Sequence, residues 1–418
     1  MQTMLSELFG MNNEKSKEFL FLGFAIPNEE MNNLVDLDKF PAMQTHKFNW
    51  NLIKGLELHG GARYTYVSAR PISDYPNYPK IFIGKKKWNE IVDNNNHISI
   101  LEIPFINVSI LKIITRFFFG LYYSLKEFHY KASKSGVIVY SVHVPFMYIG
   151  YVMSKIYSID FITIWTDPPS VVESKDRLIK SVFRKLELKL AKCVMKKSTK
   201  VVALTKGLAE DFAPNKPYII IEGIIDEKDI NTSIGKKNLK VDRNIIVAHT
   251  GSLSTRYGIQ NIVRGVILTN DKNIELDIYG RGDYEEELSE ICRNHVNIKY
   301  KGFLRNDEIL RIQGEADFLI NARSAEDDYV KYSFPSKTLE YMLSGTPLIT
   351  TMLPGIPAEY EEYVIKLEDN SPATISETIK KAKAMKCEER ELIGLKALTF
   401  ARSKSFINQG KIIAEFIL

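Results

Sequence analysis

A short polar stretch in the second half of the chain has the residue types that bind a phosphate. Ser336, Lys337 and Thr338 follow Pro335 and open an apolar helical pattern, so we expect them in a first helical turn. Free N–H groups and the positive end of the helix dipole attract a phosphate there. Glu340 lies three residues after Lys337 on the same face, where its carboxylate could accept hydrogen bonds from a ribose diol. The stretch predicts a diphosphate site, and the alternative is a capped helix with a Lys337–Glu340 surface pair.

An alternation of helical and strand patterns surrounds this stretch. Ser333 is expected to cap its helix, and Gly345 followed by Pro347 to end it. The β-branched run at 348–351 is typical of a strand buried in a parallel sheet. The other strands expected in this half, with helices between them, are 244–248, 274–279, 296–300 and 318–321.

The first half of the chain shows the same alternation at a longer period. The expected elements are strands at 18–26, 64–68, 136–142, 160–165 and 200–204, helices at 48–58, 108–130, 146–156 and 176–197, and a loop at 27–47. Residues 226–243 are polar and unpatterned, and we expect a linker there. We therefore predict the α/β class, with two doubly wound Rossmann-like domains at 1–243 and 244–400 facing a central cleft, and a terminal helix at 401–418 packing back on the first domain.

Composition excludes several classes of protein. A chain of 418 residues with 45% hydrophobic residues is long enough for two globular domains. Its net charge of +5 makes no case for nucleic acid. The three cysteines have no CxxC spacing, which argues against a disulfide framework and a zinc site. With neither a signal peptide nor a membrane span recognised, we expect a cytoplasmic protein.

Further polar residues follow the expected strands of the second half. Gly251 and Ser252 would let backbone amides approach a ligand, and Arg256 could grip an anion. Leu304 follows another strand and could wall a base, and Arg323 would be a second cation. The alternatives are a βα turn with a solvated arginine, and an Arg323 paired to a nearby acid.

These residues belong to an ordered set of motifs. The motifs are Gly251-x-Leu253, Arg256-Tyr257-Gly258, Gly302-Phe303-Leu304, Ala316-Asp317, Ser333-Phe334-Pro335-Ser336-Lys337-x-x-Glu340-Tyr341-Met342-x-Ser344-Gly345-x-Pro347, Leu353-Pro354-Gly355 and Glu359-Tyr360. The set resembles the donor domain of group 1 glycosyltransferases, the retaining family 4 enzymes of GT-B fold. Residues 44–50 and 71–76 are similar to the acceptor domain of bacterial surface-polysaccharide enzymes.

The resemblance implies transfer of a sugar from a nucleotide-diphosphate sugar, with retention at the anomeric carbon. By position, Glu340 would hold the ribose hydroxyls, while Ser336, Lys337 and Arg256 would neutralise the departing diphosphate. The resemblance also implies no metal or other cofactor, and a saccharide acceptor on a polyprenyl diphosphate lipid. A sugar-nucleotide epimerase or hydrolase of GT-B fold, and a non-catalytic partner protein, are the alternatives.

The sequence departs from the family pattern at two places. Many relatives carry a glutamate eight positions before the one at Glu340, and Tyr332 stands there in this chain. Many also carry basic residues beside the first glycine loop, where this chain has Ser252 and Tyr257. We therefore assign the phosphate charge to Arg256 and Lys337.

Candidates on the acceptor side follow the strands of the first half. Asp167 ends the strand at 160–165 and is predicted to contact the acceptor or the sugar, with a capping aspartate as the alternative. His143 is a second catalytic candidate, beside Asp167 and Glu340, and a core histidine is its alternative. His46 and Lys47 could bind an acceptor phosphate.

Two further patterns stand outside this site. Asp36-Leu37-Asp38 has the spacing of metal-dependent transferases but lacks strand context, so we predict no metal site. The segment from Lys175 to Lys200 holds ten Lys or Arg against two acids. Its helix could rest on an anionic membrane surface, which would make the protein peripheral at the inner face of the cell membrane. An ordinary domain helix is the alternative.

Overall fold

The computed structural model describes residues 16–59, 61–92, 96–169, 178–226, 228, 244–325 and 328–418. The chain divides into two compact units. Unit 1 runs to Val202 and adds Phe212–Ile219 and Gly410–Leu418, while unit 2 comprises Ala203–Asp211 and Ile220–Gln409. Apart from residues 226 and 228, the linker expected at 226–243 lies outside the described residues.

Unit 1 is built on a mostly parallel sheet. In order across the sheet its strands are β10 (Tyr218–Ile220), β9 (Lys200–Ala203), β8 (Asp160–Trp165), β7 (Lys134–Tyr140), β1 (Lys17–Gly23), β2 (Ala62–Ser68), β5 (His97–Glu102) and β4 (Lys86–Ile91). β1 pairs in parallel with β2 and β7, whereas β4 is antiparallel to β5. The short strands β3 (Phe82–Ile83) and β6 (Phe105–Ile106) form a separate antiparallel ladder. The central strand β1 is apolar almost throughout and buried, as expected for a strand covered on both faces.

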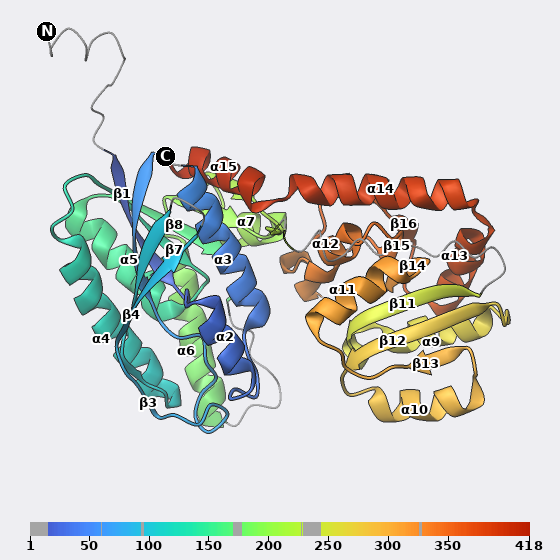
Figure 1. The fold of residues 1–418 in the computed structure, drawn as a ribbon. Helices are drawn as coiled ribbons and strands as arrows, with labels where there is room; N and C mark the ends of the chain where they lie inside the picture. Colours follow the sequence, from blue (N-terminus) through green and yellow to red (C-terminus); the bar gives the residue numbers. More distant parts are fainter. Residues whose placement is uncertain are drawn as a thin grey trace, which may run out of the picture. The chain divides into compact units, whose positions relative to one another are not determined.

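Helices cover both faces of this sheet (Figure 1). They are α2 (Asn28–Val35), α3 (Met43–Leu58), α4 (Ser109–Phe128), α5 (Val144–Tyr157), α6 (Leu178–Met195) and the later part of α15 (Phe406–Ile417). Right-handed crossovers place α4, α5 and α6 side by side on one face and α3 on the other. α15 packs closely on α3, because a Cβ on Gly410 would lie 2.4 Å from the Cα of Gly55.

The prediction of a long loop at 27–47 is wrong. α2 occupies much of it, and α3 begins at Met43, before the expected start at 48. α2 is polar overall, but its Met31 and Leu34 are fully buried and dock it on the unit. Three apolar side chains in eight residues, of which only Met31 and Leu34 are buried, give too weak a periodic signal to predict such a short helix.

Unit 2 carries a second parallel sheet. In order its strands are β13 (Ile298–Tyr300), β12 (Ile274–Arg281), β11 (Ile245–Ser252), β14 (Phe318–Asn321), β15 (Leu348–Thr351) and β16 (Ile365–Leu367). The α-helices around it are α7 (Lys206–Phe212), α9 (Ile259–Leu268), α10 (Glu285–Asn294), α11 (Asn306–Glu315), α12 (Ser336–Leu343), α13 (Pro372–Ala384) and α14 (Cys387–Ser403). Three 3₁₀ turns are η1 (Thr255–Tyr257), η2 (Asp328–Tyr332) and η3 (Ala358–Tyr363).

Adjacent residues of the strands of unit 2 enter different hydrophobic clusters. Val247 belongs to the cluster that includes α9 and α13, and the next residue, Ala248, belongs to the cluster that includes α12 and α14. Ile320 and Leu319 divide in the same way. Both faces of the sheet are therefore covered, and the expected doubly wound α/β class is confirmed. In the part of the chain that the structure describes, no helix combines the length and the apolar character needed to cross a membrane.

Candidate functional site

A cavity of about 300 Å³ lies in unit 2 at the carboxyl ends of β11 and β12. Its lining includes Gly251 and Ser252 from the end of β11, Leu304 from the loop after β13, and Lys337 from the first turn of α12. The carboxyl edge of a doubly wound sheet is the usual place for a ligand. Four residues singled out from the sequence thus line one cavity.

The strand ends at this cavity approach one another through glycine. Gly280 has a φ of +144°, and a Cβ on it would lie 1.7 Å from the carbonyl oxygen of Gly251. Only glycine fits there. The Gly280 N–H donates to the carbonyl of Gly302 at 2.9 Å, which fastens the next loop to the same edge. The backbones of three loops are therefore drawn together around the cavity.

Glu340 is oriented by two donors. Lys337 Nζ lies 2.6 Å from Glu340 Oε1, and Gln313 Nε2 donates to the same oxygen at 2.6 Å. The side chains of Lys337 and Glu340 are 25% and 15% exposed, so this is a half-buried pair rather than a solvated one. Since both contacts use Oε1, and no described residue donates to Oε2, the second oxygen can accept from a ligand.

α12 is fixed to β11 by a buried tyrosine. The Tyr341 hydroxyl donates to the Thr250 carbonyl at 2.7 Å and accepts from the Thr250 N–H at 2.8 Å. Burial raises the pKa of Tyr341 above its usual range, so the hydroxyl stays protonated. Gln313 Nε2 also donates to Thr250 Oγ1 at 2.8 Å. The helix start that carries Lys337 is therefore held rigidly against the strand end that carries Gly251.

The start of α12 differs from the expectation. Pro335 is the N-cap residue and no side chain caps the helix, so the cap expected at Ser333 is wrong. Ser336 is the first helical residue and is exposed. The hydroxyl of Thr338 is buried and has no hydrogen-bond partner among the described residues. The Thr338 N–H donates to the Pro335 carbonyl at 2.8 Å, which leaves the N–H groups of Ser336 and Lys337 for a ligand.

Arg256 and Arg323 do not line the cavity. Each of them packs against a tyrosine ring. The Arg256 guanidinium lies 4.1 Å from the ring centroid of Tyr329, and the Arg323 guanidinium lies 4.2 Å from that of Tyr257. Burial lowers the pKa of Arg323 below its ordinary value. The structure brings the two arginines to neighbouring turns, since a Cβ on Gly258 would lie 2.2 Å from the carbonyl oxygen of Ala322.

Tyr332 has a partner within unit 2. Its hydroxyl donates to Asp211 Oδ2 at 2.7 Å, and Lys331 Nζ lies 2.7 Å from the same oxygen. These two contacts lower the pKa of Asp211. Tyr332, which stands eight positions before Glu340, therefore ties η2 to α7.

Two histidines proposed for the acceptor side, the buried His46 and the half-buried His143, are neutral. His46 Nε2 forms a hydrogen bond with Asn28 Oδ1 at 2.8 Å, and burial lowers the pKa of His46 to about 4. His143 packs edge-on against Phe24, with 5.0 Å between ring centroids. Burial, with the nearby cations, lowers its pKa well below the usual value. Neither imidazole supplies a positive charge at neutral pH.

Asp167 and Lys47 are more accessible. Asp167 follows β8, is exposed, and accepts a hydrogen bond from the Thr166 hydroxyl at 2.9 Å. Its charge adds to burial in raising the pKa of Tyr140, at the end of the neighbouring strand β7. Lys47 is half-buried in α3. Unit 1 thus brings Asp167 to the carboxyl edge of its sheet, beside the end of the strand that leads to His143.

Asp38 of the Asp36-Leu37-Asp38 motif is engaged in hydrogen bonds within unit 1. Asp38 is buried, and its carboxylate accepts from the N–H groups of Phe40 at 3.0 Å and Ser73 at 2.7 Å. It therefore fastens a turn. Across the described residues, no group of three or more His, Cys, Asp or Glu side chains could hold a metal ion.

Sequence reasoning missed two buried residues that contact the elements around the cavity. Gln313 is fully buried in α11 and orients Glu340. His249 is buried in β11, where its Nδ1 contacts the Ile320 carbonyl at 3.0 Å and burial lowers its pKa to about 4. The signal in the sequence was a glutamine or histidine inside an apolar pattern. Because a buried polar side chain needs hydrogen-bond partners, such a residue indicates a polar contact inside the fold.

Comparisons with known proteins agree with this architecture. A family model described as glycosyl transferases group 1 matches residues 244–383, about a third of the chain. This segment begins with β11 and ends within α13, so it holds the whole cavity. No curated protein sequence matches the chain.

Several solved structures share the fold. HepE from Anabaena, in complex with UDP, matches with a TM-score of 0.61 at 15% identity, over 95% of this chain and 98% of HepE. A sucrose-phosphate synthase from Thermosynechococcus elongatus matches with a TM-score of 0.61 at 12% identity, over 96% and 98% of the two chains. An alpha,alpha-trehalose-phosphate synthase (UDP-forming) from Burkholderia xenovorans, in complex with glucose-6-phosphate, has a TM-score of 0.61 at 8% identity, over 94% and 98%. Identities this low establish the fold alone, and the expected GT-B fold is confirmed.

Proposed function

We propose that this protein is a retaining glycosyltransferase of family 4, which moves a sugar from a nucleotide-diphosphate sugar to a saccharide acceptor. The observation that carries the proposal is the half-buried Lys337–Glu340–Gln313 network beside a cavity at the carboxyl edge of unit 2. The match of residues 244–383 to the group 1 glycosyl transferases supports it. HepE binds UDP in the same fold, which makes UDP-sugars the first donors to test.

In the proposed donor complex, the diphosphate lies at the start of α12. The N–H groups of Ser336 and Lys337, the Ser336 hydroxyl and the Lys337 ammonium would donate to its oxygens. Glu340 Oε2 would accept from the ribose hydroxyls. As the sugar leaves, negative charge develops on the diphosphate, and donors already fixed in place stabilise that charge without reorganising. Arg256 and Arg323 would act from the neighbouring turns.

On the acceptor side we propose Asp167 as the group that contacts the acceptor or the sugar. His143 is half-buried and neutral, so its proposed part is to accept or donate a hydrogen bond rather than to provide charge. Lys47 would bind acceptor phosphate, and His46 would contribute a neutral hydrogen bond. The acceptor we propose is a saccharide on a polyprenyl diphosphate lipid, in surface-polysaccharide synthesis on the cytoplasmic side of the membrane.

The proposed reaction needs no metal. A divalent cation in other transferases offsets the charge of the leaving diphosphate, and here the helix start with Lys337 and the two arginines would take that part. Turnover should therefore persist after treatment with a chelator, whereas loss of turnover that Mg²⁺ or Mn²⁺ restores would overturn this part of the proposal.

A donor panel tests the proposal. UDP-, GDP- and dTDP-sugars are incubated with the protein, with and without a lipid-linked saccharide, and donor consumption is measured. A transferase consumes donor only with acceptor, and NMR of the product should show the anomeric configuration of the donor. Equal consumption without acceptor would identify an epimerase or hydrolase. Absence of binding to every donor in calorimetry would identify a non-catalytic protein.

A further inference from the structure

The long helix α4 turns its polar residues inward. Its buried positions follow one another at intervals of four, and they are Lys112, Arg116, Gly120, Ser124 and Phe128. On an ordinary amphipathic helix such a buried stripe is apolar. α4 therefore presents the opposite stripe, its apolar one, to solvent.

The two buried cations of α4 are held by backbone carbonyls. Lys112 Nζ donates to the Ile72 carbonyl at 2.6 Å and to Asp74 Oδ1 at 2.8 Å. Arg116 donates to the Arg70 carbonyl at 2.7 Å. The Arg116 guanidinium also lies 4.2 Å from the ring centroid of Phe105. These contacts fix the rotation of α4, so its outward face is set by the fold.

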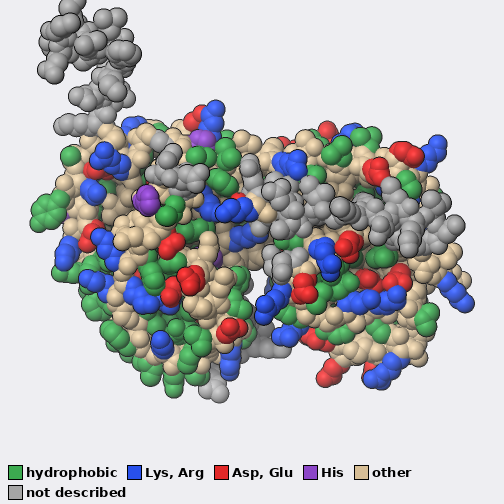
Figure 2. All heavy atoms as spheres, in the orientation of Figure 1, with side chains coloured by type: hydrophobic (Ala, Val, Ile, Leu, Met, Phe, Trp, Pro, Cys, Tyr) green, Lys and Arg blue, Asp and Glu red, His purple; other side chains and the backbone are tan. Residues whose placement is uncertain are grey.

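The outward face of α4 is large and apolar. Its exposed residues, between 39% and 64% accessible, are Ile110, Leu111, Ile114, Phe118, Phe119 and Tyr122. They span about 18 Å along the helix. No acidic residue occurs between Ser109 and Lys126. Hydrophobic side chains gather along the lower left edge of this unit in Figure 2. A patch of this extent is characteristic of a binding surface.

α6 lies in the same helical layer, on the other side of α5. Its Val182, Leu186 and Leu190 are exposed, whereas Val194 is buried. Three apolar side chains that an ordinary domain helix would bury therefore lie at the surface. The Tyr148 hydroxyl of α5 donates to the Leu190 carbonyl at 3.3 Å and joins the two helices.

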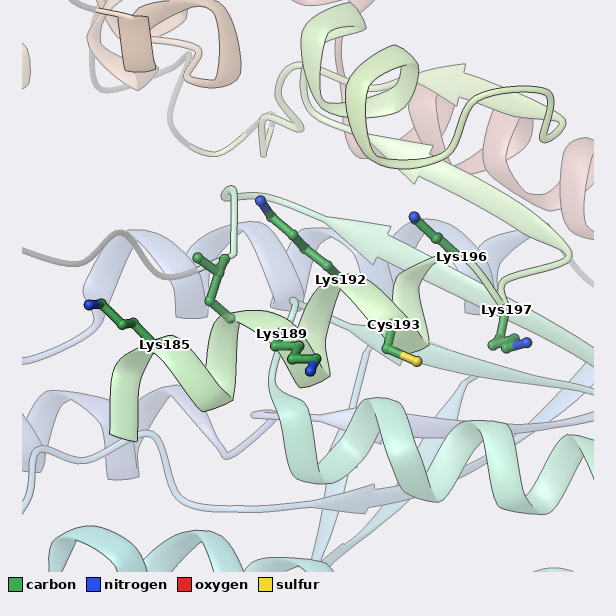
Figure 3. A pocket seen from close by; sticks show the side chains of 7 residues that line it. Lys185, Lys189, Lys192, Cys193, Lys196 and Lys197 are labelled. Carbon is green, nitrogen blue, oxygen red and sulfur yellow. The ribbon is translucent and has the colours of Figure 1, made fainter. Parts of the chain in front are cut away.

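Lysines surround this apolar layer. A depression of about 530 Å³ runs along α6, and Figure 3 shows the lysines that line it projecting from the helix and the residues just after it. They are Lys185, Lys189, Lys192, Lys196 and Lys197. On the far side of α4, Lys85 Nζ lies 5.6 Å from the ring centroid of Tyr123.

We infer that the outward faces of α4 and α6 dock on an anionic lipid bilayer, with the aromatic and aliphatic side chains in the headgroup boundary and the lysines on the phosphates. Helices with one apolar face and flanking lysines bind membranes in this way. A two-fold pairing with a second copy would bring the same lysines together, and like charges oppose it. Membrane binding itself does not depend on the proposed function. The inference rests on that function only in giving the reason for binding, which is access to a lipid-linked acceptor.

Vesicle flotation of the full chain tests the inference without any substrate. The probes are vesicles of phosphatidylcholine mixed with phosphatidylglycerol, and vesicles of phosphatidylcholine alone. The protein should float with the anionic vesicles, and added salt should weaken binding. Phe118→Ser combined with Tyr122→Ser should lower the partition coefficient by more than about tenfold. Lys189→Ala combined with Lys192→Ala should lower it about 30-fold.

Matched controls come from unit 2. Leu268 and Val296 are 55% and 84% exposed, and Leu268→Ser with Val296→Ser should leave binding unchanged. For the charge, the control is Lys206→Ala with Lys381→Ala, whose side chains are 73% and 77% exposed and whose replacement should also leave binding unchanged. Circular dichroism melts would verify that each variant folds, which the exposure of the substituted side chains favours.

Three results would overturn the inference. The first is that the protein does not float with anionic vesicles, and the second is that the α4 variant floats as well as the wild type. The third is that the protein is a dimer without lipid and that Phe118→Ser with Tyr122→Ser converts it to a monomer. In that case a second copy of the chain, rather than a membrane, would cover the outward face of α4. Donor consumption is measured separately, without vesicles. Transfer without α4-dependent flotation therefore rejects this inference alone, and flotation without turnover of any donor rejects the proposed function alone.

Discussion

The helices α12 and α4 both carry a lysine near the start and use it in opposite ways. Lys337 of α12 is half-buried, pairs with Glu340 of the same helix, and lines a cavity. Lys112 of α4 has a side chain only 9% exposed and donates to the carbonyl of Ile72. The first cation remains available to a ligand, and the second is part of the scaffold. Residue type and helical position therefore do not separate a binding lysine from a structural one, but the partner does.

The largest effect that this comparison predicts is the loss of donor turnover in Glu340→Ala. Two ribose hydroxyls that donate to a carboxylate contribute roughly 1.5–3 kcal/mol each, so kcat/KM for the donor should fall at least about 100-fold. Thermal unfolding should change little, because Gln313 keeps its bond to Thr250. Glu368→Ala, with a side chain 79% exposed, is the matched control. Near-normal turnover of Glu340→Ala would reject the site.

The helix start at the cavity could be predicted from the sequence because its parts are local. A proline followed by hydroxyl and lysine residues, an apolar helix and a glycine stop specify a helix start, and residue spacing puts Glu340 on the face of Lys337. Gln313 could not be predicted, because it lies 27 residues from Glu340 and meets it only through the packing of α11 against the sheet.

The outward face of α4 could not be predicted either. Its aromatic residues indicated a helix at 108–130, which the structure confirms, but hydropathy alone would turn those residues inward. The carbonyls of Ile72 and Arg70 reverse the expectation, because they provide partners for two buried cations. These carbonyls follow β2, about forty residues earlier, so no periodic pattern reveals the contact.

The second prediction concerns the scaffold lysine and pH. Burial and the neighbouring Arg116 lower the pKa of Lys112 to about 8, whereas the unfolded lysine titrates near its ordinary value of 10.5. Between these values the unfolded chain binds more protons, so the free energy of unfolding rises with pH. From pH 8 to 9.5 the gain should approach about 2 kcal/mol. Urea unfolding of the wild type and of Lys112→Met, in which the gain should vanish, measures it.

Equal pH slopes in these two proteins would show that Lys112 stays charged, with Asp74 offsetting its burial. In that case the lysines of α4 and α12 would differ in exposure but not in protonation. The window stops below pH 10 because tyrosines with raised pKa values, such as Tyr279 at about 12, ionise first in the unfolded chain and then lower stability.

The third prediction uses one buried histidine in each unit. Burial lowers the pKa of His46 in unit 1 and of His249 in unit 2 to about 4, against an ordinary 6.5. As the pH falls from 6.5 toward 4, the unfolded state takes up protons first, so each histidine costs up to about 1.4 kcal/mol of stability per pH unit. In plots of the free energy of unfolding against pH, His46→Gln and His249→Gln should each reduce the slope between pH 4 and 6.5. An unchanged acid slope in either variant would place that imidazole in contact with water.

The smallest predicted effect is at Tyr332, which stands where many group 1 glycosyltransferases carry a glutamate. Tyr332→Phe loses one half-exposed hydrogen bond to Asp211, and the free energy of unfolding should fall by less than about 1 kcal/mol. Tyr332→Glu should lower the free energy of unfolding further, because it places a second carboxylate against Asp211. This additional loss of stability should shrink at high salt, which screens the repulsion. Thermal melts at two salt concentrations measure both variants. If Tyr332→Glu were as stable as Tyr332→Phe, the contact with Asp211 would not explain the tyrosine, whereas a salt-dependent loss would show that a carboxylate is excluded here by Asp211.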